Sequence, residues 1–362
     1  MRAVTIGIAC ALLAAAPADL KVRAASTRTV ETVQNSRAAG GNLTLTAVPG
    51  IKVGHYSLAE RPTGCTVVLA EAGVTAGVDV RGAAPGTRET DLLSPVNTVQ
   101  QIFGLVLAGG SAFGLDAATG VMRYLDEKSV GFKVGTINVP IVPAAVLFDL
   151  QVGANPRIRP TADCGYRAAQ AATTGPVGEG NLGAGAGATI GKSAGPERAM
   201  KGGVGSSAVI MKDGLIVAAM VVVNALGDVV DPATGKVVAG VRTSDGKGLA
   251  DARILLRSGI VQRARIGANT TLGVVATNAI LTKTQATKVA QMAHDGYARA
   301  IAPSHTPGDG DTIFALATGG KAGDTDVGRI GALAADAVAD AIVRGVRQAT
   351  SIPGYPAARD LK

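Results

Sequence analysis

The chain contains few of the side chains on which metal sites and Ser–His catalysis depend. Its 362 residues include no Trp, three Cys and three His, and aromatic residues make up only 3%. His55, His294 and His305 show no paired spacing of the kind that holds a metal ion. No Ser stands in a Gly-x-Ser-x-Gly context with a His poised beside it. We therefore expect neither a metal centre nor a Ser–His triad, and we predict no cofactor.

Clustered charge is also missing. The formal net charge of +8 is spread along the chain, without a Lys/Arg run or interleaved aromatics, so a nucleic-acid partner is not expected.

Long apolar runs are scarce as well. The run at 6–16 is too short to span a bilayer, so stable membrane insertion is not predicted. With Arg2 before it and small residues near Ala25 after it, residues 1–25 are typical of a signal peptide. We expect a secreted or periplasmic protein.

Only two Cys, Cys65 and Cys164, follow that segment. In an oxidising compartment they can form one disulfide, and two buried thiols are an equally good interpretation. The pattern leaves both open.

The remaining composition favours one large domain. Hydrophobic residues make up 47% of the chain, and 49 Gly indicate a core of small aliphatic side chains with close backbone approaches. We expect a flexible polar segment at 26–44 and a single domain at 45–362. Apolar runs predict strands at 65–70, 76–80, 208–212, 215–224, 272–277 and 312–318. Asp213-Gly214 predicts a hairpin, and 3.6-residue periodicity predicts helices at 111–128, 283–302 and 330–350. This mixture is typical of a layered α/β sandwich.

The most informative segment is Gly267–Asn278, in which Asn269-Thr270-Thr271 precedes an apolar, β-branched run. Such a sequence is an ordinary entry from a turn into a strand. It acquires chemistry if the Asn269–Thr270 bond is cut, because the freed α-amine, with an ordinary pKa of about 8, then lies beside the Thr270 hydroxyl and can act as its base. The two interpretations stay open on this segment alone.

Three further segments carry polar groups with alternative roles. Ala186–Ser193 resembles a phosphate-binding loop, but the Gly- and Ala-rich stretch before it is not a buried strand, and Gly195-Pro196 prevents a helix after it. Lys192 is better explained as part of a closely packed loop beside a catalytic centre than as part of a phosphate-binding loop. Asp309 and Asp311 form a polar turn or orient a neighbouring group. Asn224, at the end of an apolar strand, caps a turn or donates to an oxyanion.

Taken together, several segments resemble the DmpA-like self-processing aminopeptidases, a family that includes L-aminopeptidase/D-esterases, β-peptidyl aminopeptidases and nylon-oligomer hydrolases. The likeness extends in matching order from about Leu45 to Gln348 and is nearest to the nylon-oligomer hydrolase pattern. It rests on the segments Arg81–Asp91, Leu107–Leu115, Asn269–Leu272 and Asp309–Thr312.

The resemblance implies a four-layer αββα sandwich of the N-terminal-nucleophile type. It also implies self-cleavage into chains 45–269 and 270–362 that stay together, and a homo-oligomer, a tetramer of such processed pairs. Thr270 matches the nucleophile exposed after Asn269, and Lys192 matches a lysine beside it. The remaining matched positions are the oxyanion-hole Asn, the acidic pair and a pocket position where relatives carry Tyr, which fall here on Asn224, Asp309, Asp311 and Phe148.

The expected function is therefore hydrolysis of a small peptide or a linear amide oligomer through an acyl-enzyme on Thr270. Phe148 lacks the hydroxyl of the family Tyr, so the resemblance leaves the substrate preference open. Two alternatives from other classes remain: a non-catalytic binding protein of the same fold, and a phosphate-binding protein that uses Gly191-Lys192-Ser193.

Overall fold

The computed structural model describes residues 41–259 and 269–361. Three predicted features lie wholly or partly outside the described residues. They are the signal peptide, residues 26–40 of the flexible segment, and Gly267 and Ala268 of the segment around Thr270.

A nine-stranded sheet forms the centre of the described chain, in the order β10-β11-β14-β16-β2-β4-β7-β3 with β1 paired to β2. Its strands are β1 (Lys52–Ser57), β2 (Gly64–Val80), β3 (Thr87–Arg88), β4 (Gln101–Ala108), β7 (Ala144–Val146), β10 (Gly203–Ile210), β11 (Ile216–Val223), β14 (Leu272–Ala279) and β16 (Thr312–Lys321). Neighbouring strands are antiparallel except for the pairs β14/β16 and β4/β7.

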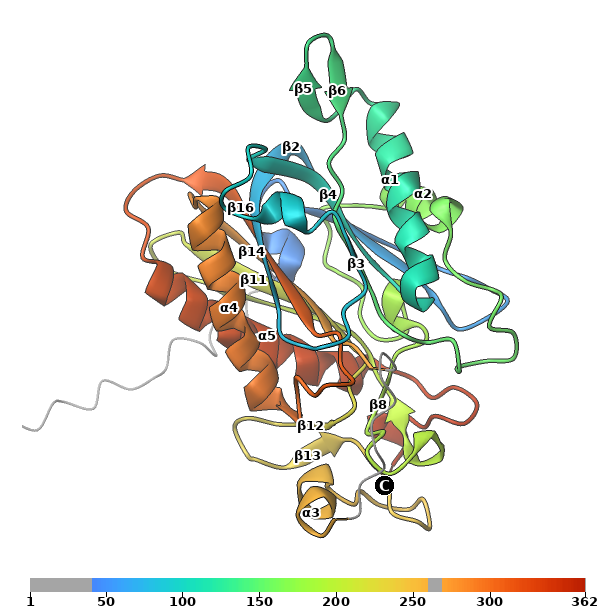
Figure 1. The fold of residues 1–362 in the computed structure, drawn as a ribbon. Helices are drawn as coiled ribbons and strands as arrows, with labels where there is room; N and C mark the ends of the chain where they lie inside the picture. Colours follow the sequence, from blue (N-terminus) through green and yellow to red (C-terminus); the bar gives the residue numbers. More distant parts are fainter. Residues whose placement is uncertain (1–40, 260–268, 362) are drawn as a thin grey trace, which may run out of the picture.

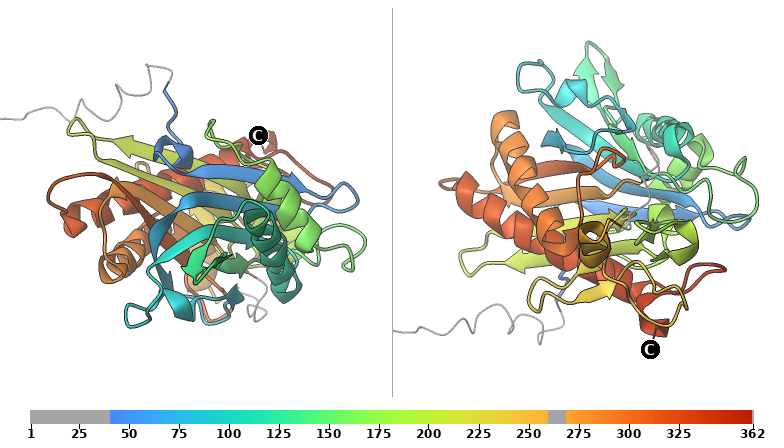
Figure 2. Two further views of the ribbon diagram at one scale, coloured as in Figure 1. Left: turned by 90° about the horizontal axis from the view of Figure 1, so that it is seen from above. Right: turned by 60° about the horizontal axis from the view of Figure 1, so that its bottom comes forward.

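Helices cover both sides of this sheet (Figures 1 and 2). They are α1 (Ala117–Asp126), α2 (Ala162–Gln170), α3 (Ala252–Arg257), α4 (Lys283–Ala300) and α5 (Val327–Gln348). Helices α4 and α5 pack on β10, β11, β16 and the second half of β2, whereas α1 and α2 pack on β1, β4 and the first half of β2. The two helix pairs thus cover different parts of the sheet on opposite sides, as the two outer helical layers of an αββα sandwich do.

Alternating side chains of the central strands build two cores. Ala218, Met220 and Val222 of β11 join the core beneath α1 and α2, whereas Val217, Ala219 and Val221 join the core beneath α4 and α5. Because successive strand residues point to opposite faces, a strand covered on both sides must be apolar throughout. This explains the unbroken apolar runs in the sequence.

Shorter elements complete the described chain. They are the strands β5 (Phe132–Val134), β6 (Ile137–Val139), β8 (Thr189–Ile190), β9 (Met200–Lys201), β12 (Asp228–Val230), β13 (Val237–Ala239) and β15 (Ile301–Ala302), and the 3₁₀ turns at 45–47, 91–93, 111–116, 183–185, 196–198 and 358–360.

Most predicted elements occur, with altered boundaries. The Asp213-Gly214 hairpin is confirmed by the antiparallel β10/β11 pair, and helix α4 begins with a capping box of Thr282 and Gln285. The two strands predicted at 65–70 and 76–80 are one long strand, β2, with a register irregularity between Leu69 and Val74.

Other boundaries were set by tertiary contacts. The helix predicted at 111–128 starts as a 3₁₀ turn, and its α-helical part begins only at Ala117. The helix predicted to reach residue 302 ends at Ala300, because Ile301 and Ala302 pair with β12. Cys65 of β2 and Cys164 of α2 form a disulfide, which decides between the two interpretations of these cysteines.

Candidate active site

The Asn269–Thr270 peptide bond lies immediately before β14. It is at the end of the sheet where the parallel central strands β14 and β16 both begin. Leu272 of β14 is in register with Thr312 of β16, so Asn269 lies beside Asp309. This parallel pairing brings together two polar segments that are 40 residues apart in sequence.

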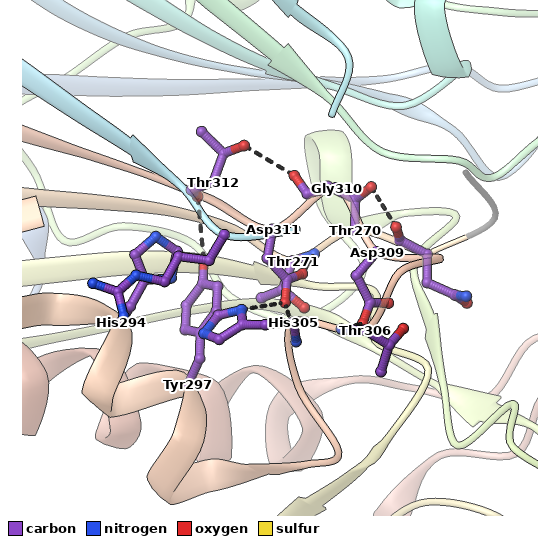
Figure 3. Close-up of polar contacts among 12 residues, drawn as sticks. Thr270, Thr271, His294, Tyr297, His305, Thr306, Asp309, Gly310, Asp311 and Thr312 are labelled. Atoms are coloured by element: carbon purple, nitrogen blue, oxygen red, sulfur yellow. Dashed lines mark hydrogen bonds and ion pairs between the residues drawn. The ribbon is translucent and has the colours of Figure 1, made fainter. Parts of the chain in front are cut away.

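The hydroxyl of Thr270 lies against the carbonyl group that precedes it. Thr270 Oγ1 donates to the carbonyl oxygen of Asn269 at 2.5 Å (Figure 3). The N–H of Gly310 donates to the same oxygen at 2.9 Å. Thr270 is 3% exposed, and its N–H donates to the main-chain oxygen of Asn224 at 2.9 Å. The peptide bond is thus fixed from both sides, and two donors polarise its carbonyl.

Gly310 is required at this place by the space available. A Cβ on Gly310 would lie 2.6 Å from Thr270 Oγ1 and 2.6 Å from the carbonyl oxygen of Ala84. Any side chain would therefore displace either the hydroxyl or the loop that donates to the Asn269 carbonyl.

The two acidic residues have different surroundings. Asp311 Oδ1 accepts from the N–H of Thr271 at 2.8 Å, and Asp311 Oδ2 accepts from the N–H and the ring Nδ1 of His305. Asp309 Oδ2 accepts from the N–H of Thr306 at 2.7 Å, while its Oδ1 is buried without a hydrogen-bond partner in the described part of the chain. Burial, together with the nearby charge of Asp311, raises the pKa of Asp309 to about 6.

Lys192 and Asn224 form the other side of the site. Asn224 Oδ1 accepts from Lys192 Nζ at 3.0 Å and from the N–H of Thr189 at 3.0 Å, so the Nδ2 group faces away and donates to the carbonyl oxygen of Phe148 at 3.2 Å. Desolvation lowers the pKa of Lys192 to about 7, although the carboxylates of Asp309 and Asp149 favour its charged form. A lysine in this state can accept or release a proton near neutral pH.

The carbonyl of Phe148 is held by a buried ion pair that sequence reasoning missed. Asp149, the next residue, accepts from Arg61 Nη2 at 2.7 Å, from Thr63 Oγ1 at 2.5 Å and from the N–H of Gly110 at 2.9 Å. The Arg61 and Asp149 side chains are fully buried. Because the donors and acceptors of this ion pair are satisfied, the pair holds in place the segment around Phe148, whose carbonyl accepts from Asn224.

All seven residues singled out from the sequence lie in this one site. Phe148 takes part through its main chain, since its carbonyl and not its ring contacts Asn224. Three contributors were not singled out as site residues: Gly310, His305 and Asp149. Gly310 and His305 lie inside the His305–Thr312 segment, so their place in the sequence was a usable signal, whereas nothing in the sequence marked Asp149.

The phosphate-loop alternative lacks its structural context. Thr189 and Ile190 form a two-residue strand, and residues 196–198 that follow form a 3₁₀ turn where a phosphate loop would open a helix. Lys192 instead binds Asn224.

Two features are absent from the described residues, 41–259 and 269–361. These residues contain no group of three His, Cys, Asp or Glu side chains able to hold a metal ion. None of the described helices is long and apolar enough to cross a membrane.

Comparison with known proteins shows the family to which the chain belongs. Residues 44–359 match the sequence profile of peptidase family S58, and the chain belongs to that family. It is 43% identical over 347 residues to an uncharacterized aminopeptidase of Mycobacterium tuberculosis, which covers 88% of this chain and 97% of the relative. It is 31% identical over 281 residues to a 6-aminohexanoate-oligomer endohydrolase of Agromyces sp., which covers 75% of this chain and 73% of the relative.

Solved structures show the same fold. The L-aminopeptidase D-Ala-esterase/amidase of Ochrobactrum anthropi, described as a variant of the Ntn hydrolase fold, superimposes with a TM-score of 0.64 at 19% identity, over 88% of this chain and 91% of that one. A β-aminopeptidase of Burkholderia sp. superimposes with a TM-score of 0.61 at 22% identity, over 86% and 88%. The family match and the aminopeptidase and amide-hydrolase relatives indicate a hydrolase of peptide or amide bonds.

Proposed function

We propose that the chain is a precursor that cleaves its own Asn269–Thr270 bond and then uses Thr270 as an N-terminal nucleophile. The observation that carries this proposal is the 2.5 Å contact between Thr270 Oγ1 and the Asn269 carbonyl oxygen, which places the hydroxyl at the bond it would cleave.

Processing would follow an N-to-O acyl shift. Thr270 Oγ1 attacks the Asn269 carbonyl carbon and gives up its proton, and the N–H of Gly310 stabilises the developing oxyanion. The C–N bond breaks as the Thr270 nitrogen is protonated, which leaves an ester between Asn269 and Thr270 Oγ1. Water then hydrolyses the ester to the Asn269 carboxylate and a free Thr270 amine. Lys192 and Asp309, whose pKa values lie at about 7 and about 6, are the groups suited to exchange the protons.

The two products would stay together because the new N-terminus begins a central strand. Strand β14 pairs with β11 of the preceding chain on one side and with β16 on the other, and every residue of β14 is buried. Separating the fragments would expose this sheet and both cores.

In turnover, the freed α-amine of Thr270 would accept the hydroxyl proton as Oγ1 attacks a substrate amide. Asn224 Nδ2 gives one N–H to the Phe148 carbonyl, and its second N–H would donate to the substrate oxyanion. Asp309 and Asp311 would keep Thr270 in the attacking orientation.

We infer a small peptide or a linear amide oligomer as the substrate. The support is the pairing of aminopeptidases and 6-aminohexanoate-oligomer endohydrolases among the relatives. We also infer export to an oxidising compartment, which the Cys65–Cys164 disulfide supports.

Intact mass and N-terminal sequencing of Thr270 variants test the proposal. The unaltered protein should yield a fragment that begins Thr-Thr-Leu-Gly-Val-Val, whereas Thr270→Ala should remain one chain and be inactive, because it lacks the attacking oxygen. Thr270→Ser should process, since it keeps that oxygen.

Thr271→Val is the matched control. The Thr271 hydroxyl is buried without a hydrogen-bond partner in the described part of the chain, so removing it should leave the same cleavage site in use. A Thr270→Ala chain that is still cleaved, or that hydrolyses amides while uncut, would sink the proposal.

A further inference from the structure

Two groups of His305, the ring and the main-chain N–H, contact the same carboxylate oxygen of Asp311. Its ring Nδ1 lies 2.9 Å from Asp311 Oδ2, and its main-chain N–H donates to the same oxygen at 3.0 Å. The other oxygen, Oδ1, accepts from the N–H of Thr271 at 2.8 Å. Asp311 therefore connects His305 directly to the residue after Thr270, as Figure 3 shows.

The hydrogen bond defines the tautomer of His305. An ionised carboxylate only accepts, so Nδ1 must carry the hydrogen. The other ring nitrogen, Nε2, is buried without a hydrogen-bond partner among the described residues. Within that part of the chain, the hydrogen bond of the ring is therefore the one to Asp311.

The ring is held in this orientation by aromatic neighbours from α4. The Tyr297 ring stacks on it at 5.7 Å and 30°, and the His294 ring meets it edge-on at 4.8 Å. The charged groups beyond them are Asp79, which contacts His294 Nε2, and Arg81, which pairs with Asp79.

The backbone at His305 provides an independent observation. Its φ of +56° lies in the left-handed region that glycine enters without a steric penalty. Glycine would keep the main-chain donor to Asp311 and avoid the strain, but it would lose Nδ1. A non-glycine residue at a strained backbone position beside an active site indicates a role for its side chain.

We propose that His305 is a positioning residue of the self-processing site: its Nδ1–H holds the Asp311 carboxylate on the N–H of Thr271 and so orients Thr270. The inference rests on the proposed function of Thr270. It assigns to His305 no contact with substrate and no proton transfer.

Two substitutions separate the donor from the ring. His305→Asn places an amide N–H close to the position of Nδ1 and removes most of the ring, whereas His305→Phe keeps an aromatic ring against Tyr297 and removes the donor. A positioning role predicts near-normal self-cleavage and kcat for His305→Asn. For His305→Phe it predicts that both fall by about 10- to 100-fold with little change in KM. A role in packing alone predicts the reverse order.

The experiment measures the self-cleavage half-time, then kcat and KM of the processed enzyme, at a temperature below the unfolding midpoint of both variants. Processing and turnover in His305→Phe at the unaltered rate would overturn the inference. So would a His305→Asn variant as slow as His305→Phe, since the donor would then not be what matters.

A parallel Thr270→Ala sample keeps the two proposals apart. If Thr270→Ala is still cleaved, the function proposed for Thr270 fails, whatever the His305 variants do. If Thr270→Ala stays intact while His305→Phe behaves normally, only the role of His305 fails.

Discussion

Lys201 is a buried amine that supports the site from outside it. Its side chain is fully buried, and Nζ donates to the carbonyl oxygens of Gly185, Ala188 and Gly202 at 2.7, 3.0 and 3.3 Å. These bonds fasten the Gly-rich loop just before Thr189, whose N–H orients Asn224. Desolvation lowers the pKa of Lys201 to about 7, and the nearby charge of Asp149 opposes this shift.

This pKa predicts how stability depends on pH. In the unfolded chain a lysine has a pKa of about 10.4, so between about pH 7 and pH 10 the unfolded state binds more protons than the folded state. The free energy of unfolding should therefore rise with pH across this window, and fall as pH drops toward 7. In Lys201→Met the slope should decrease by up to about 1.4 kcal/mol per pH unit, although the three carbonyls left without a donor lower stability overall.

Urea unfolding of uncleaved Thr270→Ala protein at several pH values measures this slope. The exposed Lys236 offers the control, since Lys236→Met should keep the slope unchanged. An identical slope in Lys201→Met and its parent would show that the buried amine stays charged across the window.

Among the elements, β10 and α5 make a close backbone approach between two layers. A Cβ on Gly205 of β10 would lie 2.0 Å from the Ala341 carbonyl oxygen and 2.3 Å from the Gly345 nitrogen, both in α5. These are backbone atoms of a 22-residue helix, which cannot yield as a flexible side chain can. The spacing between this helix and the sheet therefore depends on glycine.

We expect Gly205→Ala to lower the free energy of unfolding by at least about 2 kcal/mol, because the helix must shift away from the sheet. Gly320→Ala in the exposed end of β16 should change it little, since the nearest atom to its added Cβ is 4.0 Å away. Chemical denaturation of both variants checks this. Equal stabilities would mean that α5 can retreat at no cost.

At the scale of the whole molecule, the disulfide joins parts of the chain that are far apart in sequence. Cys65 and Cys164 are separated by 99 residues and connect β2 to α2. A cross-link that closes so long a loop restricts the unfolded chain strongly, by about 4–5 kcal/mol in the chain-entropy account.

Removing both cysteines, Cys65→Ala with Cys164→Ala, should lower the free energy of unfolding by up to that amount. Reducing agent should destabilise the unaltered protein in the same direction and leave the double variant unaffected. The measurement is thermal unfolding with and without reductant, together with a thiol count under denaturing conditions. Two free thiols in protein purified without reductant would contradict the disulfide.

The elements of the fold could be predicted where local pattern and tertiary structure agree. The Asp213-Gly214 hairpin and helix α4 were readable because turn chemistry and a 3.6-residue period act locally. The strand at 64–80 was predicted as two pieces because Gly73 interrupts its apolar pattern. Only its pairing with both β4 and β16 shows that it is continuous. Strands β1 and β4 and helix α2 were not predicted, although β4 is an eight-residue strand that is almost entirely buried. The two-residue strands β8 and β9 were missed because they are short and pair with each other across the intervening segment 191–199.

The sequence by itself determined the motif around Thr270, the acidic pair and the resemblance to one hydrolase family, because these are properties of neighbouring residues and their order. Only the tertiary structure decided that the Thr270 hydroxyl lies on the Asn269 carbonyl, that Gly310 donates to it and that His305 holds Asp311. The physical reason is the parallel pairing of β14 with β16. Its register depends on burial across both faces of the sheet and cannot be read from either strand alone.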